Sequence, residues 1–353
     1  MKTVHVSAGK PYDVFVERGL MEETGNILFE TLGRTCKAAI LTDDIVDELY
    51  GAKTEYSLKQ AGFDVCRFAI PHGEENKNLV VWGQMLDFLA SNHLTRTDVI
   101  VALGGGVVGD MAGFAAASYL RGIKFIQIPT TLLAMVDSSV GGKTAINLPS
   151  GKNLAGAFYQ PAAVICDPDA LWTLTPEILA DGVAETIKYG ILNDEALFEK
   201  LKDGRWHADI VPVIETCVRS KAAFVQQDER DTGARQLLNL GHTLGHAIEK
   251  CSDFGISHGH AVAIGMVYAA SMAWKLGLCD ESTVQRIRAA LKANNLPCSA
   301  PYTAQQLCGV ALSDKKRAGN SISYVLPYAV GDSRLYPVPV EQLEHLIELA
   351  IEE

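Results

Sequence analysis

The hydrophobic periodicity of the sequence changes once along the chain, and this change constrains the fold more than any other feature. Up to about residue 170, short apolar runs rich in β-branched residues alternate with stretches of helical periodicity. Strands that alternate with helices in this way predict a doubly wound, mostly parallel sheet. The predicted strands are residues 4–6, 14–16, 38–41, 65–70, 99–103 and 125–128.

From about Thr175 onward the periodicity is helical and β-branched runs become rare. Thr175-Pro176-Glu177 is a good helix start, because it offers a capping hydroxyl, a proline at the first position and an acid in the first turn. We therefore predict a Rossmann-like α/β domain over residues 1–170 and an all-helical domain over residues 171–353. The later predicted helices are residues 209–227, 236–251, 261–276, 281–293 and 340–352.

The charge balance limits the classes of partner. The net charge is −11, which argues against a nucleic acid or an anionic membrane surface as partner. An anionic substrate is still allowed, because a pocket can be locally basic. None of the eight cysteines forms a C-x-x-C pair, and residues 1–10 lack the apolar stretch of a signal peptide, so we expect a cytoplasmic protein with reduced thiols.

A glycine-rich turn follows the predicted strand 99–103 and opens a helix. It reads Gly104-Gly105-Gly106-Val107-Val108-Gly109-Asp110. Glycines allow close backbone approach, and a helix N-terminus offers N–H groups to a pyrophosphate, although a tight turn without a ligand can show the same pattern. No Gly-Lys-Ser/Thr follows at the spacing of a phosphate-binding P-loop, and an ordinary Rossmann dehydrogenase is not the interpretation that we favour.

A second group of glycines carries basic residues. Lys143 follows a glycine pair, Lys152 and Asn153 follow another glycine, and Arg121 precedes the predicted strand 125–128. A single lysine is usually a solvated surface residue. Two lysines clustered with glycines and an asparagine favour a phosphate or carboxylate site.

Four of the nine histidines fall between positions 242 and 260. His242 and His246 are four residues apart on one predicted helical face, and His258 and His260 follow. Together with Glu185 upstream, they offer the carboxylate and imidazoles of a catalytic zinc site with an open position. Spacing alone does not choose the two histidines that bind. The helix lacks the glutamate of H-E-x-x-H, which disfavours a zincin protease.

In order and spacing these motifs resemble the 3-dehydroquinate synthase family over nearly the whole chain. The G-G-K-T-A-I-N…G-K-N and N-L-G-H-T-x-G-H-A-I-E runs are the most specific. The matching segments are Gly104–Asp110, Pro129–Asn153, Ala184–Gly190, Asp228–Glu249, and Asp314–Lys316 with residues 325–327.

The resemblance implies a set of functional residues. A Zn²⁺ or Co²⁺ ion would be held by Glu185, His242 and His258, with His246 in the catalytic pocket. Substrate and phosphate contacts would fall on Arg121, Asp137, Lys143, Lys152, Asn153, Lys188, Lys221, Arg235, Asn239 and Lys316, the last chosen over Lys315. NAD contacts would fall on Asp43, Glu74, Lys77, Gly105, Gly106, Val107, Val108, Gly109, Asp110, Thr130, Thr131 and Thr173, and on Lys143 and Lys152 as well.

Two positions depart from the family pattern. His260 stands where the family has glutamate after the last metal ligand, so it is either a lost supporting contact or a competing ligand. Asp231 stands where the family often has glutamate. Because aspartate has the shorter side chain, we expect its contact with a polar partner to be longer.

The resemblance also implies an activity. The expected enzyme is a homodimeric lyase of the shikimate pathway that converts 3-deoxy-D-arabino-heptulosonate 7-phosphate to 3-dehydroquinate and phosphate. It would oxidise the substrate transiently with NAD, eliminate phosphate, return the hydride and close the ring by an internal aldol step, with the substrate's phosphate or His246 as base.

Three alternatives remain open from the sequence. Another sugar phosphate cyclase would share all of these motifs. A metal-dependent polyol dehydrogenase, such as glycerol dehydrogenase, is disfavoured by the basic residues around the glycine turns, because glycerol has no anion to bind. A regulatory nucleotide-binding protein with a dead site is disfavoured by the complete metal and lysine set.

Overall fold

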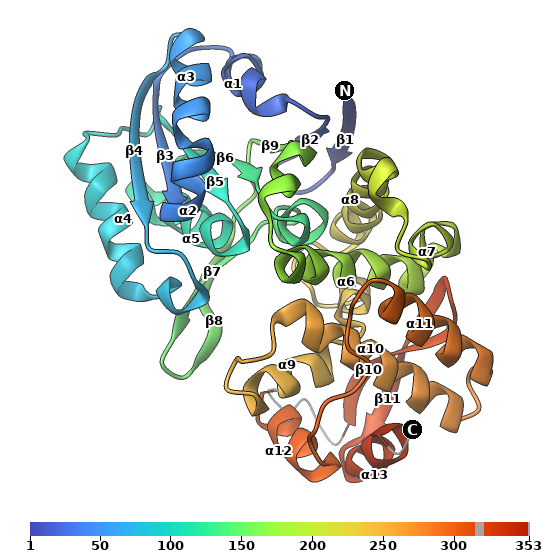
Figure 1. Cartoon of the computed structure of the whole chain (residues 1–353). Coiled ribbons are helices and arrows are strands. Elements are labelled where there is room, and N and C mark those ends of the chain that lie inside the picture. The colour runs from blue at the N-terminus through green and yellow to red at the C-terminus, as the bar shows by residue number, and fades with distance from the viewer. Residues whose placement is uncertain (315–320, 352–353) are drawn as a thin grey trace. The chain divides into compact units, whose positions relative to one another are not determined.

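The computed structural model describes residues 1–314 and 321–351, and they form two compact units (Figure 1). The sheet unit comprises residues 1–174 and 217–230, and the helical unit comprises residues 175–216 and the described part of 231–353. Helix α8 (Ile210–Gln227) starts in the helical unit and ends in the sheet unit. The assignment of NAD binding to residues 1–170 and of metal binding to residues 171–353 stays a prediction.

Seven strands form the sheet, and the predicted mostly parallel architecture is confirmed. Every neighbouring pair is parallel except β1 with β2, which pair antiparallel. All six residues of β5 are buried, which is typical of a parallel sheet covered on both faces. In spatial order the strands are β1 (Lys2–Val6), β2 (Tyr12–Val16), β9 (Ala163–Cys166), β6 (Lys124–Pro129), β5 (Val99–Gly104), β3 (Lys37–Asp43) and β4 (Asp64–Ile70).

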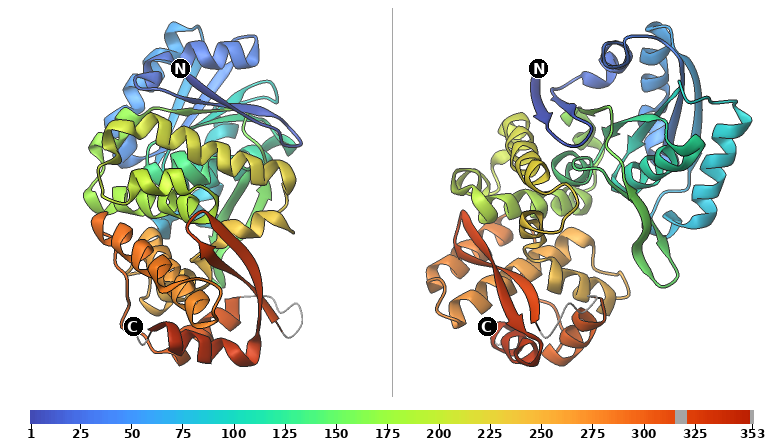
Figure 2. Two further views of the ribbon diagram at one scale, coloured as in Figure 1. Left: turned by 90° about the vertical axis from the view of Figure 1, so that its right-hand side faces the viewer. Right: turned by 180° about the vertical axis from the view of Figure 1, so that it is seen from behind.

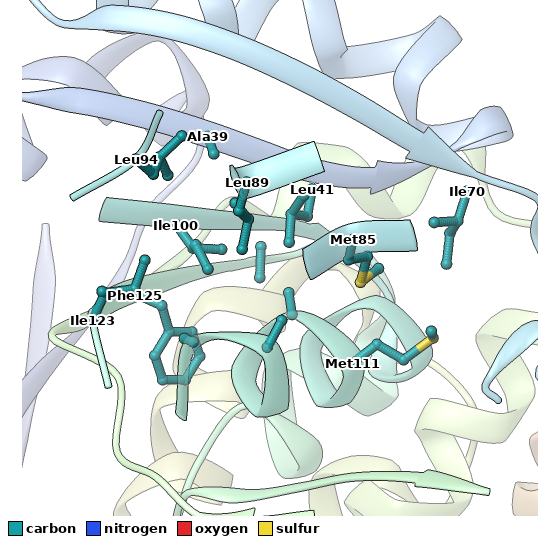
Figure 3. Packing of buried hydrophobic residues seen from close by; sticks show 14 of the residues in the cluster. Ala39, Leu41, Ile70, Met85, Leu89, Leu94, Ile100, Met111, Ile123 and Phe125 are labelled. Atoms are coloured by element: carbon teal, nitrogen blue, oxygen red, sulfur yellow. The ribbon is translucent and has the colours of Figure 1, made fainter. Parts of the chain in front are cut away.

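A hydrophobic core lies between one face of this sheet and the helices α4 (Leu79–Ser91) and α5 (Gly106–Ser118). Figure 3 shows Leu41 and Ile100 of neighbouring strands in this core, together with Met85 of α4 and Met111 of α5. Fully burying each such side chain stabilises the fold by about 2 kcal/mol. Residues that alternate with Leu41 along β3, such as Ile40, are also fully buried, so the opposite face is covered too. The sheet unit also contains the helices α1 (Thr24–Leu32) and α3 (Ala52–Gln60).

The strand order reverses between β3 and β5. The chain runs from β3 outward to the edge strand β4, and then returns to β5 on the other side of β3. Asp43 ends β3 and Gly104 ends β5, so both lie at the carboxyl edge where the order reverses. Open α/β sheets bind their ligands in the crevice at such a point.

The segment with the second glycine group, which is absent from the predicted strands, forms a β-hairpin. Strand β7 (Lys143–Leu148) pairs antiparallel with β8 (Gly151–Phe158), with a bulge between Ile146 and Leu148. The bulge and the glycines interrupt the alternation of polar and apolar residues that signals a strand. The hairpin is anchored by Ile146, which belongs to the core cluster of the sheet unit.

The helical unit consists mainly of helices, as predicted, with one hairpin that periodicity did not reveal (Figure 2). The hairpin pairs β10 (Ser321–Ala329) with β11 (Asp332–Pro339), whose prolines obscure a strand pattern. No helix within the described ranges is long and apolar enough to cross a membrane. The main helices are α6 (Pro176–Asn193), α7 (Glu195–Leu201), α9 (His242–Cys251), α10 (His258–Lys275), α11 (Glu281–Ala293), α12 (Ala304–Asp314) and α13 (Val340–Ile351).

Candidate metal centre and cofactor-binding residues

Close packing of α9 against α10 brings the candidate metal ligands together. A Cβ atom at Gly265 of α10 would overlap the carbonyl oxygen of Gly241, so only glycine allows this approach. Gly241 itself has φ +78°, which ends the preceding 3-10 helix and starts α9 afresh at His242. The predicted single helix over residues 236–251 is therefore wrong at this point. His242 and His258 begin α9 and α10, and their ring centroids lie 5.2 Å apart.

Three side chains of the helical unit converge on one point. Nε2 of His242 lies 3.4 Å and Nε2 of His258 lies 3.3 Å from Oε1 of Glu185, a buried residue of α6. Zinc–ligand bonds of about 2.0–2.2 Å in a tetrahedron separate neighbouring ligand atoms by about 3.3–3.5 Å. Neither carboxylate oxygen of Glu185 accepts a hydrogen bond of ordinary geometry from the described residues. This donor set therefore fits a divalent ion.

The other ring nitrogens of the two histidines are already engaged. Nδ1 of His242 lies 3.0 Å from the carbonyl oxygen of Leu240, and Nδ1 of His258 lies 3.2 Å from Oε2 of Glu249. A proton on each Nδ1 leaves Nε2 as the lone-pair donor, which is how metal-binding imidazoles are usually oriented.

A buried lysine balances the charge of this cluster. Nζ of Lys188 lies 2.5 Å from Oε2 of Glu185, and both side chains are almost fully buried. Burial raises the pKa of Glu185, but Lys188 and His242 outweigh that effect and hold the pKa well below its usual range. Burial lowers the pKa of His258, but interactions with Glu185 and Glu249 raise it to about 10, so Nε2 would have to release a proton when a metal ion binds. The carboxylate is therefore ionised over the physiological range.

The remaining two histidines lie in different surroundings. His246 is exposed on α9, with its ring centroid 5.5 Å from that of His242 and 5.8 Å from that of His258. His260 instead bonds to Asp181 of α6 through both its Nδ1 atom, at 2.9 Å, and its backbone N–H. His260 belongs to neither cluster of potential metal ligands found among the described residues, which argues against a competing ligand at this position.

A second cluster of potential ligands combines His246, Glu249 and His258. It shares His258 with the first cluster. Glu249, however, already serves as the hydrogen-bond partner of His258 and is therefore less available as a metal ligand. Two Nε2 atoms converge on one oxygen of Glu185, and this convergence favours Glu185, His242 and His258 as the ligands.

Most of the candidate cofactor residues lie at the carboxyl ends of adjacent parallel strands. Asp43 ends β3 and accepts a hydrogen bond from the backbone N–H of Val46 at 2.9 Å. Thr130 and Thr131 follow β6, beside the glycine turn after β5. Thr173 lies in a 3-10 helix, Pro168–Thr173, where its hydroxyl bonds to that of Tyr50 at 2.7 Å.

The start of α5 suits a pyrophosphate. The N-cap residue is Gly105, which has no side chain to cap this N-terminus, so the first N–H groups are open to another acceptor. A Cβ atom at Gly105 would lie 3.1 Å from Cγ2 of Thr131, and one at Gly106 would lie 3.2 Å from Oγ of Ser138. The backbone is thus bare where a dinucleotide would approach it, and Val107, Val108, Gly109 and Asp110 form the next turn.

Two further candidates form a buried network with this turn. Nζ of Lys77 donates to Oδ2 of Asp110 and to Oδ1 of Asn153, each at 2.6 Å. Lys77 is 4% exposed. Burial raises the pKa of Asp110, and the Lys77 ammonium opposes that rise. Glu74 accepts a hydrogen bond from Nδ2 of Asn147 at 2.8 Å.

The candidate phosphate-binding residues are divided between the two units. In the sheet unit, Lys221 forms an ion pair with Asp137 and also bonds to its carbonyl oxygen at 2.7 Å. Arg121 is exposed with φ +66°, a conformation uncommon for a residue other than glycine. Lys143 and Lys152 lie on the β7–β8 hairpin. In the helical unit, Lys188 and Arg235 are buried and Asn239 is exposed, whereas Lys315 and Lys316 lie outside the described residues.

Sequence reasoning missed Glu249. It lies three residues after His246 and seven after His242, so all three share one face of α9. That spacing is a usable signal for a carboxylate that supports a metal ligand, although the ligand it supports lies on the neighbouring helix α10.

Family models match successive parts of the chain. One described as "3-dehydroquinate synthase N-terminal" matches residues 67–181, and one described as "3-dehydroquinate synthase C-terminal" matches residues 182–317. A 3-dehydroquinate synthase from Pelobacter propionicus is 44% identical over 360 aligned residues, which cover 99% of this chain and 100% of that protein. The chain belongs to the 3-dehydroquinate synthase family. The resemblance noted from the motifs is confirmed.

Solved structures of sugar phosphate cyclases resemble this member of the 3-dehydroquinate synthase family. The 2-epi-5-epi-valiolone synthase from Streptomyces hygroscopicus, with NAD⁺ and Zn²⁺ bound, has a TM-score of 0.89 at 25% identity and covers 99% of each chain. A 2-deoxy-scyllo-inosose synthase complexed with carbaglucose-6-phosphate, NAD⁺ and Co²⁺ has a TM-score of 0.88 at 26% identity and covers 98% of this chain and 99% of that one. Both relatives bind the same two kinds of cofactor, NAD⁺ and a divalent metal ion.

Proposed function

We propose that this chain converts 3-deoxy-D-arabino-heptulosonate 7-phosphate to 3-dehydroquinate and phosphate, with NAD and either Zn²⁺ or Co²⁺ as cofactors. The observation that carries the proposal is the convergence of His242 and His258 on one oxygen of Glu185, in a chain of the 3-dehydroquinate synthase family. The dehydrogenase and regulatory alternatives do not account for family models that match residues 67–317.

The cofactors supply the oxidation–reduction chemistry. When bound, NAD takes a hydride from a substrate alcohol and later returns it, and the divalent ion polarises the oxygen of that alcohol. NAD is therefore unchanged after a full turnover, and the net reaction is loss of phosphate with closure of a carbon ring.

In the helical unit, Glu185, His242 and His258 would hold the ion. Lys188 neutralises the second oxygen of Glu185 at 2.5 Å, which keeps this carboxylate ionised and oriented. His246 is exposed beside the two metal-binding imidazoles, where a ring nitrogen can hold or move a proton. We assign proton transfer to His246 for this reason, with the substrate's own phosphate as the alternative base.

In the sheet unit, the basic residues would bind the phosphate. Lys143, Lys152 and Arg121 supply positive charge that stabilises the leaving phosphate as negative charge shifts onto it. Lys221 is fixed by its ion pair with Asp137, so its ammonium is already oriented before a ligand arrives. The N-terminus of α5 and the residues around it would receive the NAD pyrophosphate.

The deciding experiment measures two products at once. The purified protein is incubated with a divalent metal, a catalytic amount of NAD and 3-deoxy-D-arabino-heptulosonate 7-phosphate, and both inorganic phosphate and NADH are followed. Phosphate release without net NADH supports the proposal. NADH accumulation on polyols would instead identify a dehydrogenase, and phosphate release only from other six- or seven-carbon sugar phosphates would identify another cyclase.

Two further properties implied by the family resemblance remain predictions. A homodimer is tested by sedimentation equilibrium of the purified protein, and a cytoplasmic location by fractionation of the cells that produce it.

A further inference from the structure

Asn147 lies at the bulge of strand β7. The register of the hairpin shifts between Ile146 and Leu148, so Asn147 has no partner residue on β8 among the pairings of these two strands. Bulges re-aim the backbone and side chain of a strand residue. Here the backbone N–H of Asn147 donates to the carbonyl oxygen of Lys77 at 2.8 Å, which joins the hairpin to the segment after β4.

The side chain of Asn147 uses both ends of its amide. Nδ2 donates to Oε1 of Glu74 at 2.8 Å, and Oδ1 accepts from the backbone N–H of Asn153 at 2.9 Å. These two partners belong to segments with different proposed roles. Glu74 belongs to the proposed cofactor-binding segment, and Asn153 directly follows Lys152, a proposed phosphate ligand.

The hydrogen bonds close a ring of three residues. Lys77 donates through Nζ to Oδ1 of Asn153, Asn153 donates through its N–H to Asn147, and Asn147 donates through its N–H to Lys77. Asn153 is held in this ring with φ +56°, in the left-handed region that asparagine tolerates better than most residues. Such connected bonds strengthen one another and fix one arrangement of the chain.

We propose that Asn147 is a positioning residue that couples the Glu74–Lys77 segment to the hairpin carrying Lys143 and Lys152. Asn147 is not among the residues assigned to substrate or NAD, and it acts through its bonds to them. Its bonds set where the backbone of Lys152 lies relative to the cofactor-binding segment, so occupancy of the cofactor segment stabilises the arrangement that binds phosphate. The inference rests on the proposed function, which assigns those two roles.

The test reverses one hydrogen bond. Asn147→Asp keeps the shape and the acceptor for Asn153, but places a carboxylate against Glu74. Adding Glu74→Gln supplies a donor again, so the double variant restores the bond with its direction exchanged. Glu74→Gln alone keeps a donor–acceptor pair with Asn147, so it is the reference for the double variant. Leu154→Ala is the matched control, because Leu154 is 59% exposed on the same hairpin.

Three measurements decide the outcome. We expect Asn147→Asp to raise KM for the sugar phosphate roughly tenfold while kcat changes by less than about threefold. We expect weaker NAD binding by calorimetry and faster hydrogen exchange in the peptide covering residues 151–155. The double variant should recover KM and exchange to the level of Glu74→Gln alone, and Leu154→Ala should match the wild type.

The inference is overturned if Asn147→Asp binds, turns over and exchanges like the wild type, or if the double variant shows no recovery. A variant that loses its circular dichroism spectrum is replaced by Asn147→Ser, judged by the same three measurements. Hydrogen exchange and NAD binding need no turnover. A wild-type protein that fails to release phosphate would therefore refute the proposed function and still leave the coupling testable.

Discussion

Oε2 of Glu249 lies 3.2 Å from Nδ1 of His258, and Nε2 of the same imidazole lies 3.3 Å from Glu185. A carboxylate behind an imidazole fixes the ring and makes its other nitrogen a stronger donor. Glu249 is 4% exposed, so this carboxylate is withdrawn from water and is placed where it supports the candidate ion.

Replacing Glu249 should therefore weaken metal binding. We expect Glu249→Gln to lower the affinity for Zn²⁺ about 10- to 100-fold, because the ring of His258 loses its charged partner. Competition with a chromophoric chelator measures the affinity. Lys250→Gln changes an exposed neighbour on the same helix and should leave the affinity unchanged. An unaltered affinity in Glu249→Gln would show that the carboxylate does not support the ligand.

The two histidines of α9 should differ in what they do. We expect His242→Ala to abolish tight metal binding, whereas His246→Ala should lower kcat roughly 100-fold or more and change metal affinity far less. Metal content after dialysis and turnover with excess metal separate the two effects. Equal loss of metal in both variants would show that the histidines have been assigned wrongly.

Lys188 should contribute most to the stability of the fold when the metal is absent. Lys188→Met leaves the buried carboxylate of Glu185 without its ammonium, a change that costs about 3–5 kcal/mol. A bound Zn²⁺ restores positive charge beside Glu185. We therefore expect excess Zn²⁺ to raise the unfolding temperature of this variant more than that of the wild type, both measured against a chelator baseline.

The control for that experiment is Lys202→Met, which removes an exposed ion pair with Glu199. Its response to Zn²⁺ should equal that of the wild type. Equal responses in Lys188→Met and the wild type would refute an electrostatic link between Lys188 and the ion.

A carboxylate in the sheet unit should make stability depend on pH. Asp98 accepts hydrogen bonds from the backbone N–H groups of Lys37 and Thr95, at 2.9 and 2.6 Å. Burial raises the pKa of Asp98, but these bonds outweigh it and leave the pKa below its ordinary value of 3.8. A group whose pKa falls on folding stabilises the native state above the ordinary pKa, and this stabilisation is lost as the pH falls through the lower, folded value.

We therefore expect Asp98→Asn to lower the free energy of unfolding by about 2 kcal/mol at pH 7, and the difference from the wild type to shrink below pH 3.8. Denaturant unfolding across this range measures the difference. Asp64→Asn, which alters an exposed carboxylate on β4, should stay within about 0.5 kcal/mol of the wild type. A difference that grows as the pH falls would contradict a lowered pKa of Asp98 in the folded protein.

The sequence predicts well what depends on local pattern. The apolar residues of β5 and the glycines that follow predict a strand, a turn and a helix, and all three are present. His242 and His246 lie on one face of the same helix because four residues span about one turn. The metal ligands proposed from the family motifs lie within reach of one ion, although their roles stay predictions.

Features that depend on tertiary packing could not be predicted. Glu249 pairs with His258 only because α9 packs on α10, and residue spacing within either helix does not reveal this contact. The bulge at Asn147 breaks the alternation that marks a strand, so the β7–β8 hairpin resembles a loop in the sequence. His260 turns to Asp181 rather than to the metal ligands, because α6 supplies a carboxylate beside it.

The contact of Gly265 with the backbone of Gly241 determines how far apart the first residues of α9 and α10 lie. The backbone positions from which the two imidazoles extend are thus constrained by main-chain atoms, which cannot change rotamer to suit an incoming ion. Ions with bonds of about 2.0–2.2 Å to nitrogen and oxygen match this span. Calcium, which takes six to eight oxygen ligands at about 2.3–2.6 Å, is too large and finds too few oxygens. We therefore expect the absence of a side chain at position 265 to help restrict this centre to small divalent ions.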